Sequence, residues 1–77
     1  MSIKVLFFAS LREQVGKSQA EAEWQEGLTA GELWRQTSGQ DRLPDNVLIA
    51  CNQQYCSHDT LVGRGDEVAF FPPVTGG

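Results

Sequence analysis

The sequence predicts a small α+β domain in which one main helix crosses a mixed sheet of about five strands. Two observations lead to this prediction. Short runs of β-branched, aromatic or alternating residues, which are typical of strands, occur both before and after a single segment with helical periodicity. The chain has 77 residues, of which 40% are apolar, so it has the composition of one globular domain with a thin core.

The first part of the chain predicts two paired strands with a short helical turn between them. Residues 3–8 are mostly β-branched and aromatic, so they predict a strand that is largely apolar on both faces. Residues 10–15 can form a helical turn that ends at Gly16. Residues 19–24 alternate between apolar and polar side chains, which predicts a half-buried strand paired with the first.

The main helix has the clearest local signal. Thr29 and Glu32 form a capping box, in which the Thr29 hydroxyl can accept a hydrogen bond from the Glu32 amide while the Glu32 side chain reaches back to Thr29. Gly39 provides a C-terminal stop. We therefore predict a helix over residues 30–38, and its buried stripe has helical spacing and comprises Ala30, Leu33, Trp34 and Thr37.

The second part of the chain predicts three more strands. Residues 47–51 are an apolar run, residues 55–57 follow a turn, and residues 67–71 form the last strand. Leu61 is expected to enter the core from an irregular loop. This order of elements fits a β-grasp, ubiquitin-like fold, in which the first and last strands pair in parallel at the centre of the sheet.

A tail follows the last strand, so we divide the chain into a β-grasp domain over residues 1–71 and an extended C-terminal tail over residues 72–77. Pro72 and Pro73 lack backbone N–H groups, which ends the sheet ladder near Phe71. The two glycines that end the tail have no side chain and adopt any φ and ψ. This pattern predicts a flexible, narrow tip that can enter a tunnel closed to bulkier residues.

The carboxylate of Gly77 is the candidate reactive group. It is ionised at neutral pH and is a poor electrophile, so it needs activation, for example as an acyl-adenylate. The chain has no G-x-x-x-x-G-K-[ST] loop and no G-x-G-x-x-G motif, so a partner enzyme is expected to supply ATP and magnesium. Exchange of the leaving group for sulfur would make the terminus a thiocarboxylate, which is a soft nucleophile.

Charge, hydropathy and cysteine spacing narrow the classes of partner. Ten acidic residues against six basic ones give a net charge of −4 with scattered cations, so nucleic acid is not an expected partner. No apolar run approaches the ~18 residues of a membrane span, and no signal-peptide pattern is present, so we expect a cytoplasmic protein without a membrane partner. Cys51 and Cys56 do not have zinc-ligand spacing, and His58 is expected to be a solvated loop residue, so we expect neither metal nor cofactor bound by this chain.

The two ends of the chain resemble the β-grasp sulfur-carrier family that includes the small subunits of molybdopterin synthase. The opening match covers residues 3–9 and Leu11-Arg12-Glu13, and the closing match covers residues 65–77. Asn52-Gln53 also fits. Length and element order agree over the whole chain, whereas the middle carries no matching motif.

The resemblance implies a sulfur-transfer pathway. An E1-like adenylyltransferase would activate Gly77 with ATP and magnesium, and a cysteine desulfurase system would provide the sulfur of the thiocarboxylate. The tail would then enter the large synthase subunit, in a heterotetramer, and its sulfur would convert cyclic pyranopterin monophosphate into the dithiolene of molybdopterin. Catalytic side chains are expected on the large subunit, so this chain would be a sulfur-donating co-substrate and not an enzyme on its own.

Gly77 and Gly76 are thus the expected reactive end. The expected partner-binding residues are Leu6, Phe8, Arg12, Phe71, Pro72, Pro73, Val74 and Thr75. Core packing of Leu6, Phe8 and Phe71 is an alternative to their exposure, and ordering of the loop after the first strand is an alternative role for Arg12. Three other functions stay open: a sulfur carrier for thiamine thiazole synthesis, a ubiquitin-like protein modifier, and a passive interaction domain. The run over residues 70–74 favours the molybdopterin branch.

Overall fold

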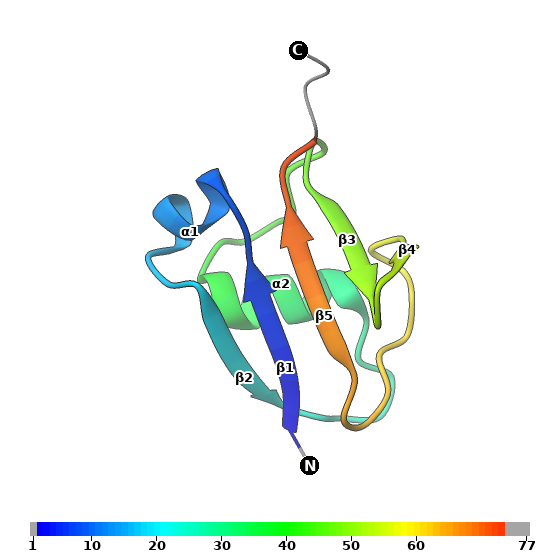
Figure 1. The fold of residues 1–77 in the computed structure, drawn as a ribbon. Coiled ribbons are helices and arrows are strands. Elements are labelled where there is room, and N and C mark those ends of the chain that lie inside the picture. Colours follow the sequence, from blue (N-terminus) through cyan, green and yellow to red (C-terminus); the bar gives the residue numbers. More distant parts are fainter. Residues whose placement is uncertain (1, 74–77) are drawn as a thin grey trace.

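The computed structural model describes residues 2–73, so the tail beyond Pro73 lies outside the described part of the chain. The described elements follow one another in the order β1 (Ser2–Phe7), α1 (Ser10–Val15), β2 (Gln19–Glu23), α2 (Ala30–Ser38), β3 (Leu48–Cys51), β4 (Gln54–Cys56) and β5 (Glu67–Phe71). The strands form one sheet in the order β2-β1-β5-β3-β4, and α2 crosses behind it (Figure 1). The predicted β-grasp fold is confirmed.

Strand β5 lies at the centre of the sheet. It pairs in parallel with β1, in a register that places Val5 opposite Val68 and Phe7 opposite Phe70, and it pairs antiparallel with β3. The predicted parallel pairing of the first and last strands is therefore confirmed. Because β5 leads directly into Pro72, the chain leaves the sheet from its middle strand, at the end where α1 lies (Figure 1).

The core lies between α2 and one face of the sheet. Trp34 of α2 packs against Phe7 and Phe70, with ring centroids 5.9 and 5.0 Å apart in edge-to-face geometry. Its Nε1 donates a hydrogen bond of 3.1 Å to the carbonyl of Arg42, so the polar end of the indole is satisfied. The predicted buried stripe of the helix is confirmed in full and comprises Ala30, Leu33, Trp34 and Thr37.

Helix α2 begins with the predicted capping box. The Thr29 Oγ1 accepts from the Glu32 amide at 3.2 Å and donates to the Glu32 carboxylate at 3.2 Å, so Glu32 reaches back to the hydroxyl of Thr29. The amide of Gly31, in the first turn of α2, donates to the carbonyl of His58 at 2.9 Å. A Cβ on Gly31 would lie 3.3 Å from His58, so glycine permits this close approach of helix and loop.

One core prediction is wrong. Leu61 is 67% exposed, and its neighbour Val62 enters the core instead with 4% exposure. Leu61 forms an isolated antiparallel bridge with Thr29, and the amide of Val62 donates to the carbonyl of Leu28 at 2.9 Å. This pairing with the segment before α2 sets which side chain points inward.

Neither helix in residues 2–73 has the length and apolarity that crossing a membrane requires.

Candidate functional site

The sheet has a second face, turned away from α2, which we call the open face. Side chains alternate along β5, so Val68 and Phe70 are buried in the core while Ala69 and Phe71 point to the open face. Leu6 lies opposite Ala69 in the register and therefore belongs to the same face. The structure thus decides between the two alternatives for the predicted docking residues: they are not buried in the core.

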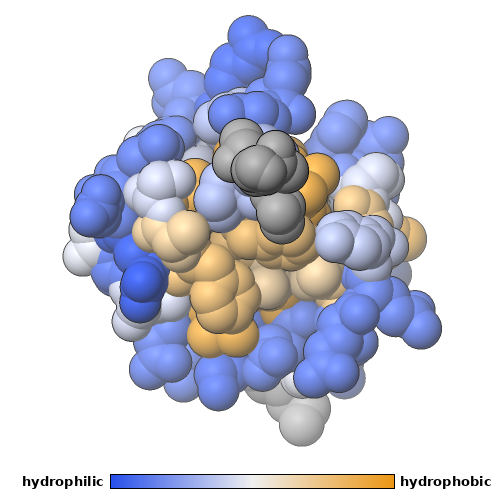
Figure 2. Space-filling model, turned by 45° about the horizontal axis from the view of Figure 1, so that its top comes forward, coloured by the Kyte–Doolittle hydropathy of each residue, from blue (hydrophilic) through white to orange (hydrophobic). Residues whose placement is uncertain are grey.

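A hollow of about 450 Å³ lies on the open face. Its lining is mostly apolar and consists of Leu6, Phe8, Ala50, Gln53, Glu67, Ala69 and Phe71. Phe8 is 46% exposed, which is unusual for so large an apolar side chain. Figure 2 shows this apolar patch framed by hydrophilic residues. The structure therefore brings Leu6, Phe8 and Phe71 together in one contiguous apolar patch. Patches of this kind are typical of surfaces that dock a partner.

Tyr55 extends this apolar surface to the edge strand β4, and sequence reasoning missed it. Its side chain is 76% exposed, and its ring centroid lies 5.8 Å from that of Phe71. In the register Tyr55 lies opposite Ala50, which lines the hollow. The sequence carried no signal for it, because a strand of three residues is too short for alternation to show which face a side chain occupies.

Three further predicted site residues belong to the described chain and lie at the end of the sheet where the tail begins, namely Arg12, Pro72 and Pro73. Arg12 is exposed on α1, while the neighbouring Leu11 anchors that short helix in the core with 2% exposure. Pro72 is half-buried and Pro73 is exposed, and β5 ends at Phe71 as predicted. Four further residues lie outside the described part, and their roles stay predictions: Val74, Thr75, Gly76 and Gly77.

A hydrogen-bonded clamp holds one rim of the hollow. The Asp66 carboxylate accepts from the amide of Gly63 at 2.7 Å and from the Asn52 side chain at 3.1 Å. The Asn52 Oδ1 in turn accepts from the amide of Glu67 at 3.0 Å. These donors, Asn52 first and Gly63 second, hold the pKa of Asp66 below its ordinary value. The clamp ties the β3–β4 turn, which contains Gln53, to the start of β5.

The two thiols are not prepared for nucleophilic chemistry. Burial, with the nearby Asp66 carboxylate as the next cause, raises the pKa of Cys51 to about 11. Burial also raises the pKa of Cys56. Both thiols are therefore protonated at neutral pH and are weak nucleophiles. The His58 Nδ1 lies 2.9 Å from the Asp59 carboxylate, and both side chains are well exposed, as expected for a solvated loop.

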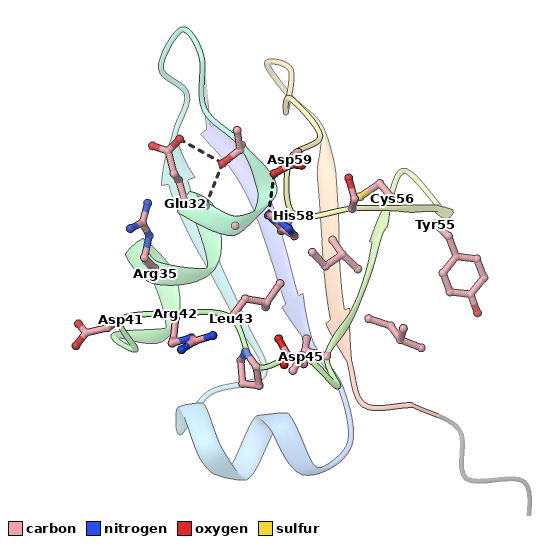
Figure 3. A pocket seen from close by; sticks show the side chains of 17 residues that line it. Glu32, Arg35, Asp41, Arg42, Leu43, Asp45, Tyr55, Cys56, His58 and Asp59 are labelled. Atoms are coloured by element: carbon pink, nitrogen blue, oxygen red, sulfur yellow. Dashed lines mark hydrogen bonds and ion pairs between the residues drawn. The ribbon is translucent and has the colours of Figure 1, made fainter.

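A larger hollow of about 700 Å³ lies between α2, the loop before β3 and the β3–β4 hairpin (Figure 3). Its lining mixes cations such as Arg35 and Arg42 with anions such as Glu32 and Asp45. Within residues 2–73 no group of three His, Cys, Asp or Glu side chains could hold a metal ion. The open face, which is mainly apolar and continues into the tail, is therefore the better candidate site.

Fold and site together define the class: a ubiquitin-like β-grasp protein whose central strand leads past an open apolar face toward a Gly-Gly terminus. Its structure is similar to that of SAMP1, small archaeal modifier protein 1, from Haloferax volcanii, with a TM-score of 0.80 and 25% identity over 100% of both chains.

The model of the ThiS family matches residues 5–77, and the chain belongs to this family. It is 44% identical over 80 residues to the molybdopterin synthase sulfur carrier subunit of Escherichia coli, covering 97% of this chain and 99% of the relative. It is 38% identical over 82 residues to the subunit of the same name from Mycobacterium tuberculosis, covering 100% and 99%. The resemblance inferred from the two ends of the chain is thereby confirmed.

Proposed function

We propose that this chain is the sulfur-carrier subunit of a molybdopterin synthase and that the Gly77 carboxylate carries the sulfur. The observation that supports this most strongly is the full-length likeness to proteins named for that role, with a family match that runs through to Gly77. The structure adds that the strand leading to the tail borders an open apolar face, where a partner can dock.

The proposed chemistry begins with activation of the terminal carboxylate. An E1-like adenylyltransferase joins the carboxylate to the adenylate of ATP, with magnesium, and releases pyrophosphate. The outer sulfur of a persulfide on the cysteine desulfurase system then displaces AMP to form an acyl disulfide, and a thiol reductant cleaves the S–S bond to leave a thiocarboxylate. In the large subunit the thiocarboxylate sulfur attacks a carbon of cyclic pyranopterin monophosphate, and water then cleaves the acyl–sulfur bond and returns the Gly77 carboxylate. Two such transfers build the dithiolene of molybdopterin.

In this proposal the chain's own contribution is to dock and to present its terminus. Leu6, Phe8 and Phe71 form the centre of the docking surface, with Tyr55 at its edge. Complete burial of a large apolar side chain contributes roughly 1.5–3 kcal/mol. Burial of the two exposed rings, those of Phe8 and Tyr55, can therefore supply much of the binding free energy of a specific interface. Gly76 and Gly77 let the chain pass a narrow channel, and Pro72 to Thr75 form the spacer.

The catalytic side chains for the pterin chemistry belong, in this proposal, to the large subunit, so the chain is a co-substrate and subunit. We place the assembly in the cytoplasm as a heterotetramer of two small and two large subunits, with Arg12 near the entry of the tail. The name of the Escherichia coli relative, a subunit of a synthase, supports the existence of a large partner.

Intact-mass spectrometry tests the proposal. Protein isolated from cells with the pathway intact should contain a fraction heavier by the replacement of one oxygen by sulfur. Deletion of Gly77 should abolish that fraction and leave the melting temperature unchanged, because the buried core of the described residues ends at Phe70. Absence of the heavier species in the wild type, when the activating enzyme is present, would contradict sulfur carriage.

A protein-modifier function is the second candidate, and the similarity to SAMP1 favours it. The same adenylate would then be attacked by a lysine amine to form an isopeptide bond, and mass spectrometry would show conjugates of higher mass. A carrier for thiamine thiazole synthesis would share the fold and the Gly-Gly end. Against both, relatives at 31–44% identity are named molybdopterin synthase sulfur carrier subunits.

A further inference from the structure

Three carboxylates lie on the open face, on the side of the hollow away from the tail. The strand register places Glu21 and Glu67 on either side of Lys4, and Glu23 two residues beyond Glu21. Because side chains alternate along strands, all three carboxylates point to the same face as Leu6. Glu67 also lines the hollow itself. We call Glu21, Glu23 and Glu67 the acidic strip.

The acidic strip is not neutralised inside the described chain. Lys4 is the one cation in register with it, and within residues 2–73 no lysine or arginine forms an ion pair with its carboxylates. Glu67 is half-buried beside apolar side chains, so a partner that covers the hollow removes more water from its carboxylate. Covering an unpaired carboxylate is costly unless the partner supplies a cation or donors for it.

The strip is continuous with the apolar hollow. Phe71 and Glu67 are the two ends of β5, which places them on the order of 13 Å apart along the strand. A specific protein interface covers about 800 Å² on each partner, which is wide enough to include both. A protein that docks on the hollow therefore also meets the strip.

Charge decides which kind of protein fits. Three carboxylates and one lysine make the part of the open face away from the tail negative, on a chain whose net charge is −4. Two copies of this chain joined face to face with their strands parallel would bring the two strips together, which like charges oppose. An acidic partner would meet the same repulsion, whereas a basic surface would be attracted from a distance.

We infer that the open face docks a partner surface in which an apolar prominence is flanked by lysine and arginine side chains that meet Glu21, Glu23 and Glu67. This inference rests on the proposed function, because the large synthase subunit, which takes the tail in that proposal, is the partner that covers this face. It adds β2 to the interface and states the chemistry of the surface opposite.

Charge reversal with a matched control tests the inference. The strip variant is Glu21→Lys with Glu23→Lys, and the control is Asp41→Lys with Asp59→Lys, whose residues line the larger hollow on the helix side. Both double variants change the net charge by the same amount, and all four positions are exposed. Calorimetry measures binding to the large synthase subunit at low and high salt, and circular dichroism confirms that each variant is folded.

The strip variant should bind at least about tenfold more weakly at low salt, with a gap that narrows as salt rises, while the control stays within about twofold of the wild type. Lys4→Glu should bind more tightly than the wild type. Equal affinities for the strip variant and the control would overturn the inference alone. The inference would also be overturned if light scattering showed that the wild type is a homodimer and that Phe71→Ala dissociates it. A wild-type chain that fails to bind the large subunit would contradict the proposed function itself.

Discussion

Phe70 and Phe71 are neighbours in β5 whose side chains lie on opposite faces of the sheet, so alanine at each position separates folding from docking. Phe70 is fully buried and packs against Trp34. Phe71 is half-buried on the open face and lies beside Tyr55. The same change of side chain should therefore have two different consequences.

The structure sets the expected magnitudes. Phe70→Ala removes a buried ring and should cost about 3–5 kcal/mol, out of a total stability of about 4–12 kcal/mol for a domain of this size. At roughly 4 °C or more per kcal/mol, the melting temperature should fall by at least about 12 °C. Phe71→Ala removes a ring already in contact with water and should cost about 1 kcal/mol of stability. It should weaken binding of the large subunit by about 2 kcal/mol, or roughly 30-fold, as expected for a central aromatic residue.

Thermal melts and calorimetry on the wild type and three variants measure both quantities. Leu61→Ala is the control for loss of an exposed apolar side chain, because Leu61 is 67% exposed and does not line the hollow. It should leave stability and affinity nearly unchanged. Wild-type affinity for Phe71→Ala would remove Phe71 from the interface. A loss of stability as large as that of Phe70→Ala would show that Phe71 is a core residue.

Three further predictions concern the clamp, a thiol and a strained residue. Asp66→Asn should flatten the pH dependence of stability on the acid side. Because the pKa of Asp66 is lowered in the folded state, its contribution to stability is present above the unfolded pKa of about 3.9 and is lost as pH falls through the folded pKa. Acid titration followed by circular dichroism measures this effect. The thiol of Cys51, with its pKa raised to about 11, should react with iodoacetamide at pH 8 much more slowly in folded than in denatured protein. The corresponding stability should be present below the ordinary value of 9.0 and lost as pH rises toward 11. Ala9→Gly should raise stability by about 1 kcal/mol in urea titrations, because Ala9 has φ 54° and ψ −131°, a region that glycine adopts without strain.

Features set by contacts close in the sequence could be predicted well. The limits of α2 follow from Thr29, Glu32 and Gly39, each of which acts within one turn of the helix end. Strand β5 follows from its β-branched and aromatic run and from Pro72, which cannot extend the ladder. The parallel pairing of β1 with β5 was reachable because the order of elements leaves few topologies.

Features set by contacts between residues distant in the sequence could not be predicted. Which of Leu61 and Val62 enters the core depends on a bridge to Thr29, more than thirty positions earlier in the chain. Whether Leu6 and Phe8 are buried depends on which face of β1 is covered by α2, since both faces of that strand are mostly apolar. Tyr55 lies in a strand of three residues, too short for alternation to reveal its face.

The apolar character of both faces of β1 and β5 follows from what each face contacts. On one face, Phe7 and Phe70 pack against α2. On the other face, Phe8 is 46% exposed on the described chain, and an exposed apolar ring lowers solubility. Under the proposed function, a partner covers this surface. Because β5 is held by neighbours on both sides, the point where the tail begins is fixed relative to the hollow, so a partner that binds the hollow also determines where the terminal carboxylate enters. Under the proposed function, docking at the hollow would position the Gly77 carboxylate in the partner, and the partner would supply the catalytic side chains.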